Sequence, residues 1–114
     1  MQSNLFSTLM AIASVHPMGF TIDSQNLSPV VSGYAVAVAD TQNSFGRDGL
    51  RTVIKYAKKN KSVNAYGGWY DTESGFYYWD AVIVYNNLSD AIKAGRDNKQ
   101  IAIYDLANNN EIRL

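Results

Sequence analysis

Acid–base or metal chemistry in this chain would have to come from a few scattered side chains. The carboxylates that fall in or beside expected strands and loops are Asp23, Asp40, Asp71, Glu73, Asp80 and Asp105. No spacing aligns two of them as a general acid and a general base. His16 is the only histidine and there is no cysteine, so the spacings typical of a metal site or a thiol nucleophile are missing. We therefore predict that the protein is not an enzyme and has no catalytic residues, no metal and no cofactor.

A polar segment from Asp40 to Gly46 is a second place where a ligand could bind. It joins an expected strand to an expected helix, where loops often hold anions or polar ligands. Its candidate ligand residues are Asp40, Thr41, Gln42, Asn43 and Ser44. No Lys-Ser or Lys-Thr follows Gly46 or Gly49, so it is not a phosphate-binding glycine loop. The alternative, which the sequence favours, is that Ser44 or Asp48 caps the helix.

The strongest compositional signal is aromatic. Half of the chain's fourteen aromatic residues fall between Tyr66 and Asp80. Two β-favouring stretches flank the segment Asp71–Gly75, which predicts a hairpin with a loop of about four or five residues and a positive φ at Gly75. Alternate residues of a strand point to opposite faces, so one set of rings can enter a core while the other meets a helix, a ligand, a partner or water.

Tyr and Trp are enriched in protein interfaces, and these rings exceed what one core face can use. The predicted partner-binding residues are Trp69, Tyr70, Phe76, Tyr77, Tyr78 and Trp79. The alternative, again favoured by the sequence at each position, is that the rings are only core and cross-strand packing.

Nucleic-acid binding is a further alternative for the hairpin. The segment Gly75–Trp79 loosely resembles the aromatic motif on which RNA-recognition domains stack bases. Ser74 stands where that motif has Lys or Arg, and Tyr77 stands where it has a small residue. Ten basic and ten acidic residues cancel, so no bulk field attracts nucleic acid or an anionic membrane. Single-stranded nucleic acid is therefore a disfavoured partner.

The elements that must position these residues follow from the apolar pattern. The expected helices are residues 5–15, 48–60 and 89–98, the last capped by Ser89. The two arms of the hairpin are expected strands, and the second arm reaches Tyr85. The other expected strands are residues 20–22, 33–39, 100–106 and 111–114. The run at 33–39 is typical of a central strand buried on both faces. Gly95, inside a helix, predicts close packing of that helix on the sheet.

From Tyr34 to Leu106 the order is strand, helix, strand, strand, helix, strand. That order predicts an α+β fold with a ferredoxin-like (βαββαβ) core, an antiparallel sheet with helices on one face. An extra N-terminal helix and short terminal strands would complete it. We find no linker or internal repeat, so we predict one domain over residues 1–114.

Three blocks of the sequence resemble a known group of proteins when taken together. They are Gly19–Asp23 with Gly33–Ala37, Gly67–Asp71 with Ser74, Gly75 and Tyr78, and Ala91–Lys93 with Asn98 and Gln100–Leu106. The combination, which covers about Gly19 to Leu114, resembles uncharacterised small proteins of bacteriophages, prophages and conjugative elements. The resemblance implies a cytoplasmic accessory protein of a mobile element that inhibits a host defence protein or nuclease by direct binding.

The leading prediction is a non-enzymatic accessory protein that binds a host or phage protein through the aromatic hairpin. The alternatives are a single-stranded nucleic-acid-binding module using the aromatic sheet face, and a small-ligand-binding module using residues 40–46. No Lys or Arg precedes the apolar stretch at residues 5–15, and the stretch is far shorter than the ~20 residues of a membrane span. We therefore expect neither a signal peptide nor a membrane partner. The sequence leaves the partner's identity and the oligomeric state open.

Overall fold

A computed structural model describes residues 2–114 of the chain, with side chains from Leu5 onward. In chain order the elements are α1 (Gln2–Val15), β1 (Phe20–Asp23), β2 (Tyr34–Ala37), the 3-10 turn η1 (Ala39–Thr41), β3 (Ser44–Phe45), α2 (Gly46–Lys59), β4 (Ala65–Asp71), β5 (Phe76–Tyr85), α3 (Leu88–Asp97), β6 (Ala102–Asp105) and β7 (Asn110–Arg113). Each helix and strand expected from the sequence is present to within a few residues. The turn η1 and the short strand β3 are the two elements that the sequence does not predict.

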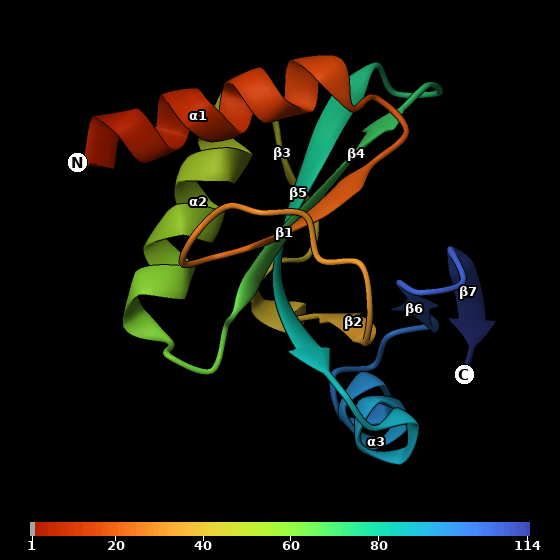
Figure 1. Cartoon of the computed structure of the whole chain (residues 1–114). Helices are drawn as coiled ribbons and strands as arrows, with labels where there is room; N and C mark the ends of the chain where they lie inside the picture. Colours follow the sequence, from red (N-terminus) through yellow and green to blue (C-terminus); the bar gives the residue numbers. More distant parts are fainter. Residues whose placement is uncertain (1) are drawn as a thin grey trace.

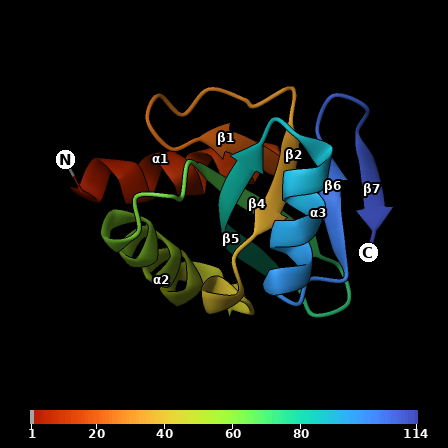
Figure 2. The same cartoon turned by 90° about the horizontal axis from the view of Figure 1, so that it is seen from below.

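The strands form one antiparallel sheet in the order β1-β4-β5-β2-β6-β7, and β3 pairs with the first half of β5. The α+β class and the antiparallel sheet are therefore confirmed. The strand order is more complex than that of a four-stranded ferredoxin-like core. The strand β1 extends the sheet beyond β4, and β7 extends it beyond β6. Figures 1 and 2 show β6 and β7 beside α3, on the opposite side of the molecule from α1 and α2.

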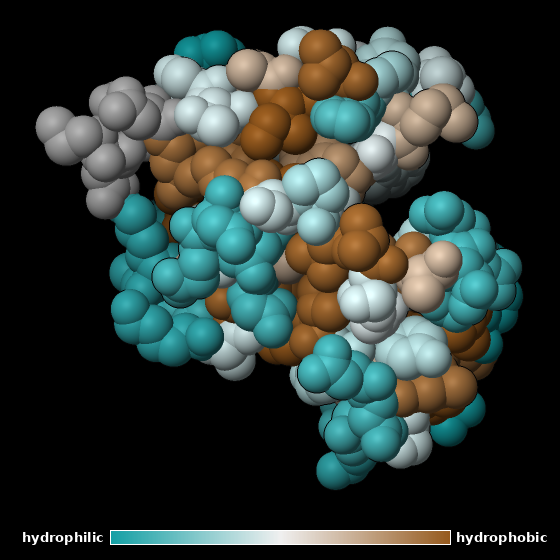
Figure 3. All heavy atoms as spheres, in the orientation of Figure 1, coloured by the Kyte–Doolittle hydropathy of each residue, from teal (hydrophilic) through white to brown (hydrophobic). Residues whose placement is uncertain are grey.

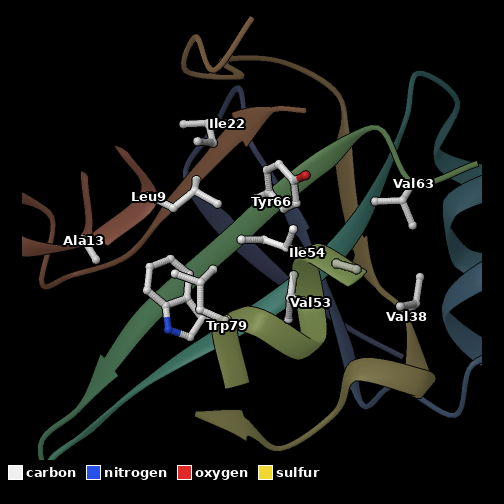
Figure 4. Close-up of a cluster of buried hydrophobic side chains, with 11 residues drawn as sticks. Leu9, Ala13, Ile22, Val38, Val53, Ile54, Val63, Tyr66 and Trp79 are labelled. Atoms are coloured by element: carbon white, nitrogen blue, oxygen red, sulfur yellow. The ribbon is translucent and has the colours of Figure 1, made fainter. Parts of the chain in front are cut away.

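The main core lies between α1, α2 and one face of the sheet. On α2, Leu50, Val53 and Ile54 recur at helical spacing, and all three are buried. Figure 4 shows the labelled members of this cluster, Leu9, Ala13, Ile22, Val38, Val53, Ile54, Val63, Tyr66 and Trp79. Burial of this apolar surface is the dominant favourable term in folding.

The helix α3 covers the same face of the sheet farther along. Its Ala91 packs with Val36 of β2 and Ile103 of β6. The register places Val36 opposite Ile83 of β5, which lies on the same face as Trp79. Gly95 approaches the sheet so closely that a Cβ there would lie 2.9 Å from Cγ2 of Ile103, which confirms the predicted close packing. Within residues 2–114, all three α-helices therefore lie on one face of the sheet, and the other face carries none.

Two sequence predictions about local structure are wrong. The strand β2 is not buried on both faces, because no helix covers the second face; within it only Val36 is buried. The cap of α3 is Asn87 and not Ser89, since the Asn87 side chain accepts hydrogen bonds from the backbone N–H groups of Ser89 and Asp90. None of the helices within residues 2–114 has the length and apolarity that a bilayer crossing requires.

Candidate functional site

The hairpin of β4 and β5 has the turn that the sequence predicts. Four residues separate Asp71, the end of β4, from Phe76, the start of β5. Gly75 adopts a φ of 78°, a region that favours glycine, and its N–H donates to the Asp71 carbonyl at 2.8 Å. The Asp71 side chain also accepts from the backbone N–H of Glu73 at 3.1 Å, which fixes the start of the loop.

Strand alternation divides the six predicted binding residues into two sets of three. Tyr70, Tyr77 and Trp79 point to the helix-covered face, and Trp69, Phe76 and Tyr78 point to the open face. Trp79 is 2 % exposed and belongs to the core. Tyr77 is half-buried and its hydroxyl donates to the His16 carbonyl at 2.9 Å. The hairpin thus presents three of its rings, and not six, on the open face.

Phe45 of β3 joins these three rings on the open face. The register places Phe45 opposite Tyr78, and Tyr78 opposite Trp69. Ring centroids are 5.6 Å apart for Phe45 and Tyr78, 5.1 Å for Trp69 and Tyr78, and 4.5 Å for Phe45 and Phe76. We call Phe45, Trp69, Phe76 and Tyr78 the aromatic row. Its rings run across three neighbouring strands, and three of them are more than 40 % exposed.

Phe45 is held in place by the start of α2. Gly49 lies directly against the backbone of Ser44, so a Cβ at position 49 would collide with the Ser44 carbonyl carbon. The start of α2 thus packs directly against β3, and the register of β3 with β5 puts Phe45 on the open face, opposite Tyr78. Sequence reasoning missed Phe45, because a strand of two residues shows no periodicity. The available signal was a lone Phe between Ser44 and Gly46, in an otherwise polar segment.

The five predicted ligand residues at 40–44 do not converge on one site. Thr41 is fully buried, and its hydroxyl accepts a hydrogen bond from the Ala81 N–H at 3.1 Å. Ser44 is buried in β3, whereas Asp40, Gln42 and Asn43 are exposed. The predicted capping of α2 is also wrong, since its N-cap is Phe45 and no side chain caps it.

Asp80 lies on the open face next to the aromatic row. It follows Tyr78 by two positions on β5, and it is partly buried. Within residues 5–114 its carboxylate forms no hydrogen bond and no salt bridge to another side chain or to the backbone. Burial raises the pKa of Asp80 to about 6 from a usual 3.8, because the charged form loses hydration that nothing replaces. The carboxyl of Asp80 is therefore strongly perturbed by its burial.

The helix side of the hairpin borders a cavity of about 440 Å³. Its lining is mostly apolar and includes Met10, Pro17, Tyr70 and Tyr77. Figure 3 shows apolar surface beneath α1, next to the hydrophilic outer face of α2. A second hollow of about 640 Å³ lies where α2 begins, against Phe45 and Phe76. Of the five predicted ligand residues, Asn43 and Ser44 line the second hollow, and none lines the first.

The part of the chain that the structure describes contains no group of three His, Asp or Glu side chains placed to hold a metal ion. No family model, no curated protein and no solved structure matches this chain. The aromatic row and the charges around it are therefore the features of the molecule that bear on function.

Proposed function

We propose that this protein is a non-enzymatic binding protein that docks a macromolecular partner, a protein, through the aromatic row. The observation that carries the proposal is the row itself: four rings in mutual contact on the sheet face that no helix covers. Rings held by cross-strand contacts offer large apolar area with little side-chain entropy left to lose. Rigid aromatic side chains of this kind dominate the free energy of many protein interfaces.

The charges beside the row favour a protein over a nucleic acid. An exposed row of rings is also the kind of platform on which bases stack. Asp80 and Asp71, however, lie on the same face of the same two strands. Their carboxylates repel a phosphate backbone, which would otherwise supply most of the non-specific affinity.

The resemblance to proteins of mobile elements extends the proposal. A cytoplasmic accessory protein of a phage or conjugative element would use the row to cover and inhibit a host defence protein or nuclease. We also propose that the central part of the fold is ferredoxin-like. The consecutive neighbours β6-β2-β5-β4 support this, with α2 lying between β2 and β4 in the chain and α3 between β5 and β6.

A photo-crosslinking experiment tests the proposed function. Benzoylphenylalanine is placed at position 69 or, as a control, at position 101, where Ile101 is 73 % exposed outside the row. Each tagged protein is irradiated in a bacterial host lysate, and the captured protein is identified and purified. Its affinity is then measured for the wild type, Trp69→Ala, Tyr78→Ala and Ile101→Ala.

We expect capture from position 69 and not from position 101. We expect Trp69→Ala and Tyr78→Ala to weaken binding roughly tenfold or more, and Ile101→Ala to change it by less than about twofold. All three variants must keep the wild-type circular dichroism spectrum. Equal affinity of Trp69→Ala and the wild type for the captured protein would remove the aromatic row from the proposal.

A further inference from the structure

We infer that the partner surface is basic, and that a Lys or Arg of the partner stacks on the aromatic row and pairs with Asp80. This inference rests on the proposed function and specifies the chemistry of its partner. Three independent features of the open face support it: the position of Asp80, the unpaired state of its carboxylate, and the engagement elsewhere of Arg47 and Arg51, which border the hollow beside Phe45.

The position of Asp80 suits a long basic side chain that crosses the row. On the open face its strand neighbour is Tyr78, and its diagonal neighbour across the hairpin is Trp69. Diagonal residues on one sheet face have Cβ atoms about 7–8 Å apart, which the stem of a Lys or Arg can span. The residue directly opposite Asp80 is Gly67, which places no side chain between the carboxylate and the Trp69 ring.

The carboxylate of Asp80 is partly buried and has no compensating partner. Neither a donor nor a cation reaches it from the residues whose side chains the structure describes. Burying a charge without a partner is unfavourable, and an arriving cation would remove that penalty. The raised pKa of this carboxyl has burial as its cause, in agreement with the geometry. An arriving cation would therefore gain the charge interaction with Asp80 and offset the cost of its burial.

The cations of the chain that come nearest to the row are engaged elsewhere. Arg47 and Arg51 border the hollow beside Phe45, but both guanidinium groups lie 4.9 Å from the Phe6 ring of α1, on the helix side. Arg51 also pairs with Asp48 at 3.0 Å. At the opposite end of the row Asp71 adds a second carboxylate on the open face. The open face of the hairpin is thus acidic around an aromatic centre.

An aromatic centre flanked by carboxylates favours cations for two reasons. The face of a Trp or Tyr ring attracts an ammonium or guanidinium group, with Trp the strongest. The carboxylates add a charge interaction that an apolar or acidic segment could not use. The nucleic-acid-binding surface of a nuclease is itself basic, so a partner of that class would meet this requirement.

The test uses the whole ¹⁵N-labelled protein and defined peptides as probes. Three short peptides of equal length are titrated at low salt: one rich in Lys and Arg, one rich in Glu and one of Gly and Ser only. A single-stranded oligonucleotide forms a fourth arm. The variants are Asp80→Asn and, as the matched control, Asp97→Asn. Asp97 is an exposed carboxylate at the end of α3, on the helix side of the sheet. Each variant replaces one carboxylate by an amide, so the two variants differ in where the carboxylate is lost.

We expect the basic peptide alone to shift the amide resonances of Trp69, Tyr78 and Asp80, with an affinity that falls as salt rises. We expect Asp80→Asn to weaken this binding about fivefold or more, and Asp97→Asn to leave it within about twofold. Any of three results would overturn the inference: no shift with the basic peptide, equal shifts with the acidic peptide, or unchanged binding of the basic peptide by Asp80→Asn. A stronger response to the oligonucleotide at the same amides would overturn it in favour of nucleic acid.

The same variants separate this inference from the proposed function. If the captured protein is lost on Trp69→Ala but is bound equally by Asp80→Asn, the aromatic row is the interface and the partner is not basic there. If Trp69→Ala has no effect on the captured protein, both statements fail together.

Discussion

Trp69 and Tyr78 stack face to face across β4 and β5, with ring centroids 5.1 Å apart and planes 16° from parallel. Both rings lie on the sheet face that no helix covers, and Trp69 remains 45 % exposed. Ten residues along the chain from Trp69, the second tryptophan, Trp79, is 2 % exposed in the core. One hairpin therefore holds one tryptophan for the surface and one for the interior.

The two tryptophans should differ sharply when each is truncated. We expect Trp79→Ala to lower the free energy of unfolding by about 3–5 kcal/mol, because it leaves a large cavity beside Leu9 and Val53. We expect Trp69→Ala to lower it by about 1 kcal/mol or less, since only a cross-strand pair is lost. Urea denaturation followed by circular dichroism measures both values. Similar losses for the two variants would contradict the division of the hairpin into two faces.

Thr41 should be needed for its hydroxyl and not for its shape. The hydroxyl oxygen accepts from the Ala81 N–H at 3.1 Å inside the core. Thr41→Val keeps the volume but leaves a buried N–H unpaired, so we expect a loss of about 1–3 kcal/mol in unfolding free energy. Thr41→Ser keeps the acceptor and should lose less. The comparison is made by thermal or urea denaturation, and Val and Ser variants of equal stability would count against this role.

The charge of Asp80 should make stability depend on pH. The folded-state pKa is raised to about 6 from a usual 3.8, so the folded protein holds this proton more tightly than the unfolded chain does. The stability contribution of Asp80 is present in full below pH 3.8 and is lost as the pH rises through about 6.

We therefore expect Asp80→Asn to exceed the wild type in unfolding free energy by about 2 kcal/mol at about pH 8, with the difference falling toward zero at about pH 4. Denaturation of both proteins at the two pH values measures this. Asp97→Asn, at an exposed carboxylate, serves as the reference. An Asp80→Asn variant that is less stable than the wild type at the higher pH would show that the carboxylate has a partner in the free protein.

Two glycines at the start of α2 should respond differently to alanine. Gly49→Ala would force a methyl group against the Ser44 backbone, so we expect a loss of about 2–3 kcal/mol despite the better helix propensity of Ala. At Gly46 nothing lies within 4 Å of an added Cβ, and only the φ of 68° opposes the change. Gly46→Ala should therefore lose about 1 kcal/mol. Thermal denaturation distinguishes them, and Gly49→Ala should also weaken partner binding by displacing Phe45.

Periodicity predicted the helices and the hairpin because these segments are long enough to show it. The 3.6-residue stripe of Leu50, Val53 and Ile54 identified α2, and the turn chemistry at Gly75 identified the loop between β4 and β5. The strand β3 is too short for any period, so its pairing with β5 and the place of Phe45 follow only from tertiary contacts. The burial of Thr41 also follows only from tertiary contacts, since its hydroxyl satisfies a backbone group of a strand that is distant in sequence.

The division of the hairpin into two faces could be predicted, but the choice of face could not. Because side chains alternate between the two faces of a strand, Phe76 and Tyr78 share one face and Tyr77 and Trp79 share the other. Which pair enters the core depends on which side of the sheet α1 and α2 occupy, and no local pattern states that. The raised pKa of Asp80 could not be predicted from the sequence for the same reason, because it arises from burial of this side chain in the folded protein.

The alternation along β5 also separates what folding requires from what binding requires. Odd positions such as Tyr77, Trp79 and Ala81 pack beneath the helices, while even positions such as Phe76 and Tyr78 face outward. Phe76, which is exposed, can therefore be exchanged with little effect on the core, whereas Val82, also at an even position, is buried. Substitutions at the exposed positions of this strand would change the chemistry of the open face and leave the architecture the same.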